Sequence, residues 1–412
     1  MPASASTRSP IHLIGRMTLA NWMLVAAVGG LATGWLAPAF ALSLSWMSDL
    51  FLRLIRMIIA PLLFGVLVPA IGGAGATRDL GRIGVKSLLL FEVATTIALL
   101  LGWATGLVLQ PGVGMVLPAG LEAPSVSAPT SLVSVLVQAV PTSIFDAMAR
   151  GDVLQIVVFC LVFGMAALSV GPRARPVLEF ADAVAAITSR CTHYIVWFAP
   201  AAVFAALAGT VAASGANALA GLTRFVVAAW AAEVLFLFGV IGPALVWAGV
   251  PLRRFVHHVR EPFLVAFATT SSAAALPQAL EGMARLGVSN RVLGFVTPLS
   301  LSLHMNGSTL YLGLATLFVA QAAQVPLPLH TQLLMLLTLK LTSKGIAGIP
   351  RANFVILAAL FESFGLPLAA LAILLGVDAL IDTIRTSVNI ASHCAAPAIV
   401  ARWEGESLEQ DA

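Results

Sequence analysis

Long apolar stretches alternate with short polar connections along most of this chain. A helix needs about 20 mostly apolar residues to cross the hydrocarbon layer of a membrane. By that measure the pattern predicts eight membrane-spanning helices, at about residues 17–42, 46–75, 83–110, 153–170, 188–213, 221–250, 291–324 and 366–401. The first stretch could instead be a cleaved signal peptide, but its apolar run exceeds the ~7–15 residues usual for one.

Two further apolar segments, 254–287 and 329–365, are interrupted by small polar residues, glycine and proline. The first contains TSSAAALP at 270–277, and the second contains TSKGIAGIP at 342–350. Paired broken segments in corresponding positions indicate the binding site of a transporter. Their freed backbone groups are tolerated in a membrane only around a protein-lined or watery cavity. The pattern favours two re-entrant helical hairpins, with two unusual packing helices as the alternative.

Composition supports an all-α integral membrane protein. Of the 412 residues 59% are hydrophobic and only 10% are charged, whereas a soluble domain has about 25% charged residues. This excludes a nucleic-acid-binding module, a disordered protein and an ordinary cytosolic enzyme. Three widely spaced cysteines form neither a disulfide framework nor a zinc pattern. We find no catalytic triad, metal cluster or phosphate loop, and so expect no enzymatic activity, no metal and no cofactor.

The distribution of Lys and Arg predicts the orientation. With the N-terminus inside, 14 of the 22 cationic residues lie in inner loops and termini: Arg8, Arg16, Arg78, Arg82, Lys86, Arg173, Arg175, Arg190, Arg253, Arg254, Arg260, Arg285, Arg291 and Arg402. The outer segments hold only Arg150 and Arg224. Since cytoplasmic loops are enriched in cations, we expect both termini in the cytoplasm and a multi-pass protein of the cell (inner) membrane, surrounded by lipid.

The last span carries the strongest candidate site. Five polar residues fall at i, i+3, i+4, i+7 and i+11 and share one helix face: Asp382, Arg385, Thr386, Asn389 and His393. Ionised groups inside a membrane span are expensive and usually functional. The Arg385 fork of donors suits a carboxylate, and Asp382 suits an ammonium group. An ion pair that only joins helices is the alternative, but it does not need the three additional polar groups.

Several motifs, in order, resemble the dicarboxylate/amino acid:cation symporter family, the glutamate transporter homologues. The last span resembles that family's D-x-x-R-T-x-x-N signature, and the runs at 270–277 and 342–350 resemble its hairpin tips. HMNGS at 304–308 stands where the family has N-M-D-G-T, and FLRLIRMIIAPL at 51–62 is similar to its second-span signature. The similarity covers residues 17–403 and is strongest to bacterial proton/glutamate-aspartate symporters.

The resemblance implies a homotrimer with an elevator mechanism, in which a transport domain moves against a trimerisation scaffold. The scaffold would comprise 17–75 and 153–213. The transport domain would comprise 83–110 and 221–403, including both hairpins, with 329–365 as the outer gate. The remaining segments are a cytoplasmic N-terminal tail (1–16), an outer loop (111–152) and a cytoplasmic tail (404–412).

Position by position, the resemblance also implies a substrate site. Arg385 would bind a side-chain carboxylate and Asp382 an amino group. The hairpin tips would hold the α-carboxylate, and the second tip would close over it. The implied substrate-binding residues are Arg385, Asp382, Thr386, Asn389, Ser271, Ser272, Ser308, Ser343, Gly345 and Gly348.

Asp382 bears on the choice of substrate. A C4-dicarboxylate has no amino group, so its carboxylates would be repelled by this aspartate, and dicarboxylate-specific relatives have a neutral residue here. A neutral amino acid would leave Arg385 buried and unpaired, which is expensive. We therefore expect glutamate or aspartate, with a C4-dicarboxylate as the alternative.

The departures from the family pattern concern the coupling cation. Two carboxylates that bind sodium in relatives are replaced by Asn306 and His393, and the first asparagine of the loop motif is His304. Histidine is a poor sodium ligand but titrates near neutral pH. We therefore expect protons rather than sodium to couple, while a channel-like or sensory homologue that binds substrate without coupled transport remains open.

Glu92 is the first candidate proton carrier, followed by His393 and His304. Buried carboxylates bind protons more readily than exposed ones, and Thr95 and Thr96 follow Glu92 in a region that helps form a third cation site in sodium-coupled relatives. The alternatives are a structural, hydrogen-bonded acid at 92 and neutral core histidines. Lys340 and Lys344, one helical turn apart, could substitute for cation charge.

Overall fold

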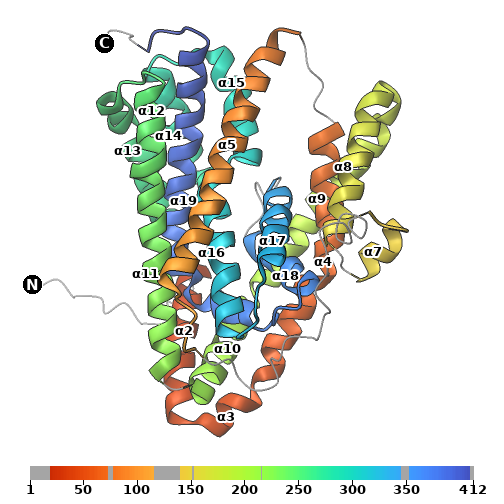
Figure 1. The fold of residues 1–412 in the computed structure, drawn as a ribbon, viewed down its shortest axis with the longest axis vertical. Helices are drawn as coiled ribbons and strands as arrows, with labels where there is room; N and C mark the ends of the chain where they lie inside the picture. The colour runs from red at the N-terminus through yellow and green to blue at the C-terminus, as the bar shows by residue number, and fades with distance from the viewer. Residues whose placement is uncertain are drawn as a thin grey trace, which may run out of the picture.

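The computed structural model describes residues 19–72, 78–115, 140–150, 153–214, 216–344 and 352–408. Within these ranges the regular structure is entirely helical, in agreement with the predicted all-α class (Figure 1). The expected tail at 1–16 and much of the expected outer loop lie outside the described residues.

The first half contains α2 (Leu19–Leu36), α3 (Pro38–Ser43), α4 (Ser45–Gly72), α5 (Arg78–Leu109), α7 (Ile144–Arg150), α8 (Val153–Val170), the short 3₁₀ helix η1 (Gly171–Ala174), α9 (Arg175–Val196) and α10 (Ala199–Ser214). The single span predicted at 188–213 is instead divided between two helices, α9, which already begins at Arg175, and α10, with a turn at residues 197–198. Charged residues such as Glu179 and Asp182 on the exposed side of α9 lower its hydropathy. Its other side packs on α4, where Gly65 approaches the backbone of Ala181 and Ala185.

The second half contains α11 (Ala216–Phe236), the π-helical turn η2 (Leu237–Ile241), α12 (Gly242–Trp247), α13 (Leu252–Thr269), α14 (Ser272–Arg285), α15 (Asn290–Leu303), α16 (Asn306–Ala322), α17 (Leu329–Thr342), α18 (Ala352–Ser363) and α19 (Ala370–Trp403). Where the first hairpin was predicted, α13 and α14 pack against each other. The turn between them contains Thr270, whose φ is 52°, and Ser271 caps α14.

The stretch predicted as one span at 291–324 is broken. Helix α15 ends at Leu303, and α16 begins at Asn306 after the two non-helical residues His304 and Met305. The break falls in the HMNGS motif, so the backbone groups of this motif are free to make contacts outside a continuous helix.

Helices α5, α11, α16 and α19 lie side by side in one body, and α8 and α9 lie against α4 in another (Figure 1). Small residues permit the close approach of α5 and α16: a Cβ at Gly102 would lie 2.0 Å from the Leu310 carbonyl oxygen. Such glycine contacts are characteristic of helix packing in membranes.

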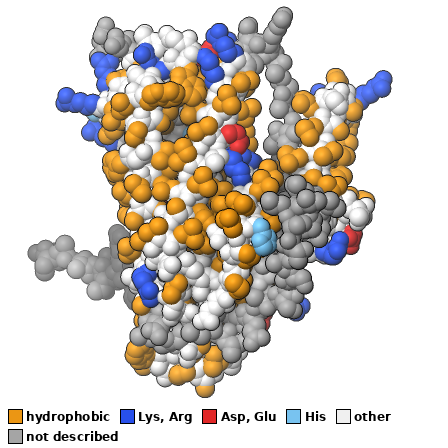
Figure 2. All heavy atoms as spheres, in the orientation of Figure 1, with side chains coloured by type: hydrophobic (Ala, Val, Ile, Leu, Met, Phe, Trp, Pro, Cys, Tyr) orange, Lys and Arg blue, Asp and Glu red, His pale blue; other side chains and the backbone are white. Residues whose placement is uncertain are grey.

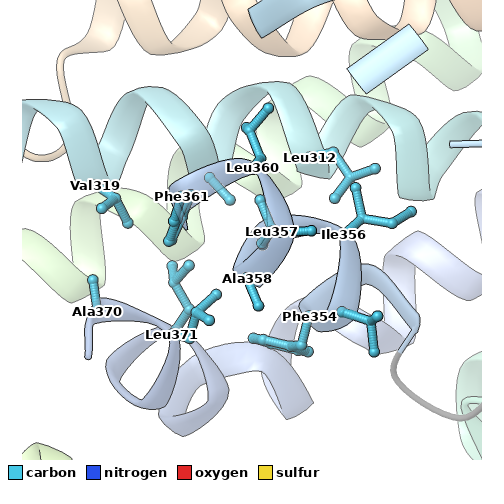
Figure 3. Packing of buried hydrophobic residues seen from close by; sticks show 14 of the residues in the cluster. Leu312, Val319, Phe354, Ile356, Leu357, Ala358, Leu360, Phe361, Ala370 and Leu371 are labelled. Atoms are coloured by element: carbon cyan, nitrogen blue, oxygen red, sulfur yellow. The ribbon is translucent and has the colours of Figure 1, made fainter. Parts of the chain in front are cut away.

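Helix α18 lies at the centre of the larger hydrophobic core. Residues 353–360 are buried without interruption, so α18 has no exposed face. Figure 3 shows side chains of α18, including Leu357 and Phe361, between Leu312 and Val319 of α16 and Leu371 at the start of α19. This packing places the second arm of the predicted outer hairpin against the helices that carry the candidate site.

The outer surface is largely apolar. Figure 2 shows hydrophobic side chains over most of one face, with charged side chains mainly near the ends of the molecule and one acidic and basic group midway. Among the described residues, four helical stretches are long and apolar enough to cross a membrane: Pro38–Pro69, Arg82–Leu109, Val158–Thr192 and Leu219–Trp247. The polar last helix is not among them, because its charges lower its hydropathy.

Candidate functional site

The buried face of α19 centres on Arg385. Its Nη1 donates to Asp378 Oδ1 at 2.8 Å, and its Nη2 donates to Asp382 Oδ1 at 2.6 Å. Thr386 Oγ1 donates to the same oxygen of Asp382 at 3.1 Å. Arg385 is 4% exposed and Asp378 is fully buried, whereas Asp382 is 19% exposed. One guanidinium is thus held by two aspartates, and Asp382 is the more accessible of them.

Tyr311 of α16 supports this arrangement. The Arg385 guanidinium carbon lies 4.5 Å from the centre of the Tyr311 ring, close enough for cation–π attraction. Removing one partner of such a buried ion pair costs about 3–5 kcal/mol, because the other charge is left uncompensated. The cluster is therefore fixed in position, and an anionic ligand must compete with Asp382 for the Arg385 donors.

Asn389 joins α19 to the start of α16. Its Oδ1 accepts from the backbone N–H groups of Gly307 and Ser308, at 2.9 and 3.3 Å, and its Nδ2 donates to Ser308 Oγ at 3.1 Å. The N–H groups of the first helical turn have no partner within the helix, so this side chain caps α16. The structure thus brings together the predicted residues Asn389 and Ser308.

The three residues that depart from the family's motifs, His304, Asn306 and His393, are all buried. Asn306 Nδ2 lies 3.0 Å from His304 Nε2 and donates to Ser392 Oγ at 3.0 Å, and the His304 ring stacks on Phe91. His393 makes no hydrogen bond from either ring nitrogen to any described residue. Since Nε2 of His304 accepts from the Asn306 amide, that nitrogen carries no proton in this arrangement. Neither Asn306 nor His393, the two residues expected in place of carboxylates, provides a negative charge here.

The hairpin tips are only partly described. Ser271 Oγ accepts from Ala274 N at 3.3 Å, and Ser272 is the half-buried first residue of α14. Ser343 is buried at the end of α17, and its hydroxyl donates to the Lys340 carbonyl at 3.2 Å. The predicted residues Gly345 and Gly348 lie outside the described residues. Both arms of the first hairpin pack against α19, but no hydrogen bond joins Ser271 or Ser272 to the Arg385 cluster among the described residues.

Glu92 lies on the side of α5 that faces α17. Its carboxylate accepts from Lys340 Nζ at 3.0 Å and from Lys344 Nζ at 2.5 Å. Lys340 also donates to the Glu92 carbonyl oxygen at 2.9 Å and to the Thr95 hydroxyl. The side chain of Glu92 is half exposed, so the buried carboxylate expected from the sequence is instead a partly exposed, doubly paired one. Thr96 is exposed and donates to the Glu92 carbonyl oxygen.

Two further acidic residues, Asp378 and Glu233, are buried in this region. Asp378 binds Arg385 from one turn before Asp382, which the i, i+7 spacing to Arg385 could have indicated. Glu233 of α11 is fully buried, and its spacing along α11 gives no indication of what lies opposite. Only the packing of α11 against α19 reveals its surroundings.

The geometry suits recognition of a small zwitterion or dianion rather than bond-breaking chemistry. A guanidinium fork, an accessible carboxylate and a hydroxyl lie within one helical turn on α19, and the broken pair α15 and α16 packs against that helix. This combination is typical of substrate sites in secondary transporters. Residues 19–403 match the sodium:dicarboxylate symporter family.

This chain belongs to the sodium:dicarboxylate symporter family. It is 38% identical to a C4-dicarboxylate transport protein of Anaeromyxobacter sp. (strain K), over 93% of this chain and 89% of the relative. It is 37% identical to the proton/glutamate-aspartate symporter of Bacillus subtilis (strain 168), over 94% and 95%. A proton/sodium-glutamate symport protein of Geobacillus stearothermophilus is 34% identical over 90% of each chain.

The family match confirms the resemblance drawn from the motifs. The protein is accordingly an integral membrane transporter of the symporter class, whose relatives are named for C4-dicarboxylates, glutamate and aspartate. The names of these relatives differ in the substrate and in the coupling cation. The choice for this chain therefore has to be argued from its own residues.

Proposed function

We propose that this family member is a secondary active symporter that imports glutamate or aspartate together with protons. The observation that carries the proposal is the pairing of Arg385 with the accessible Asp382 on one face of α19. When an acidic amino acid binds, its side-chain carboxylate replaces Asp382 at the guanidinium. The released Asp382 then accepts the substrate's ammonium group. The exchange leaves both protein charges paired, which limits the cost of burying them.

The charge balance favours an amino acid over a dicarboxylate. Asp378 remains on Arg385 from the buried side, so a succinate dianion would add two negative charges beside two aspartates. An acidic amino acid adds one net negative charge and supplies a cation for Asp382. C4-dicarboxylate symport is the alternative, and it is supported by the 38% identical relatives with that name.

Proton coupling is supported by the groups at the family's cation positions. Asn306 and His393 provide no carboxylate there, and the His304 ring is buried against Phe91. In addition, the Lys340 ammonium lies among oxygen atoms of Glu92 and Thr95. Oxygen atoms of this kind are the ligands that a hard cation would otherwise use. A tethered ammonium in this position reduces the need for a sodium ion. An uncoupled, channel-like or sensory homologue is the second alternative.

The architecture proposed with this function is a homotrimer in the cell (inner) membrane that works by an elevator movement. The separate packing of α4 with α8 and α9, and of α5 with α11, α16 and α19, is compatible with a scaffold and a transport domain (Figure 1). The Glu92–Lys340 and Glu92–Lys344 pairs hold α17, the first arm of the second hairpin, against α5.

Competition for uptake tests the substrate class. The purified protein in proteoliposomes is offered labelled aspartate with excess unlabelled glutamate, succinate or malate. We expect glutamate to suppress the signal and succinate to leave most of it. Suppression by succinate alone would favour the dicarboxylate alternative, and binding without accumulation under any ion gradient would favour an uncoupled homologue.

A further inference from the structure

A buried carboxylate outside the described substrate residues lies beside the site. Glu233 is in the last turn of α11, has 0% exposure, and neither of its carboxylate oxygens has a hydrogen-bond donor among the described residues. The carboxylate lies against Gly307: a Cβ there would be 3.0 Å from Oε2 and 3.2 Å from Oε1. A side chain larger than hydrogen at 307 would displace it.

The same glycine connects Glu233 to the substrate helix. A Cβ at Gly307 would also meet the Arg385 carbonyl oxygen at 2.6 Å, and the Gly307 N–H donates to Asn389. Trp230, one turn earlier on α11, donates from Nε1 to the Leu380 carbonyl of α19 at 2.9 Å. Glu233 is therefore at the level of the Arg385 cluster, where α11, α16 and α19 meet.

Several elements pack against α11, and their charged groups determine the field at Glu233. Helix α10 and η2 carry no charged or titratable side chain, and α16 carries only Tyr311. The titratable or charged groups of the other two elements are Asp378, Asp382, Arg385, His393, Cys394 and Arg402 on α19, and Arg78, Asp79, Arg82, Lys86 and Glu92 on α5. Arg385 attracts the Glu233 carboxylate through space, but its donors are already used by two aspartates.

Burying an ionised carboxylate without hydrogen bonds is costly, and the group avoids the cost by taking up a proton. We propose that Glu233 is the residue that carries the coupling proton. The carboxylic acid is neutral in the closed packing described here. It releases its proton when the transport domain that contains α11, α16 and α19 has moved and water reaches this contact from the cytoplasmic side. The proposal deepens, and rests on, the proposed function as a proton-coupled symporter.

Charge explains why the proton and the substrate would travel together. Arg385 balances one of the two aspartates, so the cluster has a net charge of –1 before substrate binds. An acidic amino acid adds another negative charge, which makes an ionised Glu233 less favourable still. By linkage, if bound substrate increases the affinity of Glu233 for a proton, the bound proton increases the affinity for substrate by the same factor. Acidic substrate and a protonated Glu233 therefore stabilise each other.

The test is the pH dependence of aspartate affinity, measured by titration calorimetry on the purified protein in sodium-free buffer from pH 5 to 10. For wild type we expect affinity to fall about tenfold per pH unit in the alkaline part of the range, as required when one proton binds with the substrate. Glu233→Gln, whose side chain imitates the neutral acid, should bind at every pH about as tightly as wild type does at low pH. Glu233→Asp keeps a titratable group and should keep the slope.

Two further variants make the result specific. Glu281→Gln changes an exposed acid that pairs with Arg285 and should have the wild-type slope. If the slope disappears in Glu92→Gln and persists in Glu233→Gln, the proton belongs to Glu92 and the inference is overturned, while proton coupling stands. If wild type shows no pH dependence and binds only with sodium, the proposed proton coupling itself fails.

Discussion

At the scale of single residues, the account depends on how Arg385 is shared. The helical spacing predicted that Asp382, Arg385 and Thr386 lie together, and the structure places them within hydrogen-bond distance. The Asp378 carboxylate binds the other side of the guanidinium, and the signature did not predict this contact. The signature begins at Asp382 and names residues that bind substrate, so it omits the residue that orients Arg385. Arg385 is thus oriented by Asp378 and left accessible through Asp382.

Replacing Arg385 should abolish uptake of acidic substrates. Arg385→Ala removes the carboxylate-binding fork and the positive charge beside two aspartates, whereas Arg385→Lys keeps the charge but loses the bidentate geometry. We expect aspartate uptake to fall at least about 100-fold in both, consistent with loss of a buried pair. Arg190→Ala, which removes an exposed arginine stacked on Tyr194, is the control. Retained aspartate affinity in Arg385→Lys would remove this residue from the site.

Asp382 should determine the choice between amino acid and dicarboxylate. Asp382→Asn keeps the side-chain volume and removes the charge that pairs with an ammonium group. We expect the ratio of aspartate to succinate uptake to fall by about 10-fold or more, which corresponds to one charge-assisted hydrogen bond. Asp146→Asn on the exposed helix α7 is the matched control. An unchanged ratio would mean that Asp382 does not contact the amino group.

At the scale of elements, the predicted broken segments correspond to recognisable helices, but their tertiary contacts were beyond the pattern. The run at 270–277 coincides with a turn and a serine cap, and the HMNGS motif coincides with a break between helices. In contrast, the sequence predicted a buried acid at Glu92, and the structure pairs it with Lys340 of α17 and with Lys344 just after that helix, about 250 residues away in sequence. Hydropathy cannot reveal a pairing between distant helices.

Lys340 should hold the second hairpin closed. Its ammonium joins α17 to the Glu92 carboxylate, the Glu92 carbonyl and Thr95 on α5. Lys340→Met removes all of these bonds at similar length. Ser343 is only 4% exposed, so a cysteine at this position reports opening of the hairpin. The reporter is Ser343→Cys in a protein whose native Cys160, Cys191 and Cys394 are replaced by alanine. A membrane-impermeant thiol reagent should label it several-fold faster in the Lys340→Met background. Equal labelling rates would exclude a closing role.

Glu404 should stabilise the contact between the start of α5 and the end of α19 in a pH-dependent way. Hydrogen bonds from Arg82 and Lys86 lower the pKa of Glu404 below its ordinary value of 4.5. A lowered folded-state pKa gives stability that is complete above pH 4.5 and is lost as pH falls through the folded value. Because Arg82 is 70% exposed, the contribution is about 0.5–1 kcal/mol.

Melting temperatures of wild type and Glu404→Gln therefore differ at pH 7 and converge at an acidic pH below the folded-state pKa of Glu404. Glu281→Gln, which removes an exposed carboxylate paired with Arg285 on the same helix, should follow wild type throughout. A difference that is the same at both pH values would show that the Glu404 carboxylate acts through packing and not through its charge.

At the scale of the whole molecule, low charge identified a membrane protein, and the positions of the few interior charges identified its chemistry. The hydropathy pattern located most helices, including α19 at the span predicted for 366–401, although α19 is more polar than the four stretches that are long and apolar enough to cross a membrane. Its charges are paired within the bundle by Asp378, Asp382 and the ring of Tyr311. The family of the chain follows from this pattern, whereas the substrate and the coupling cation depend on single residues.

The most direct test of the central claim is accumulation of labelled aspartate in proteoliposomes under an imposed gradient. With an inward proton gradient in sodium-free choline medium, we predict uptake above equilibrium that collapses when a protonophore is added. Adding an inward sodium gradient without a pH difference should not restore it. Accumulation that requires sodium and ignores the pH gradient would contradict the account.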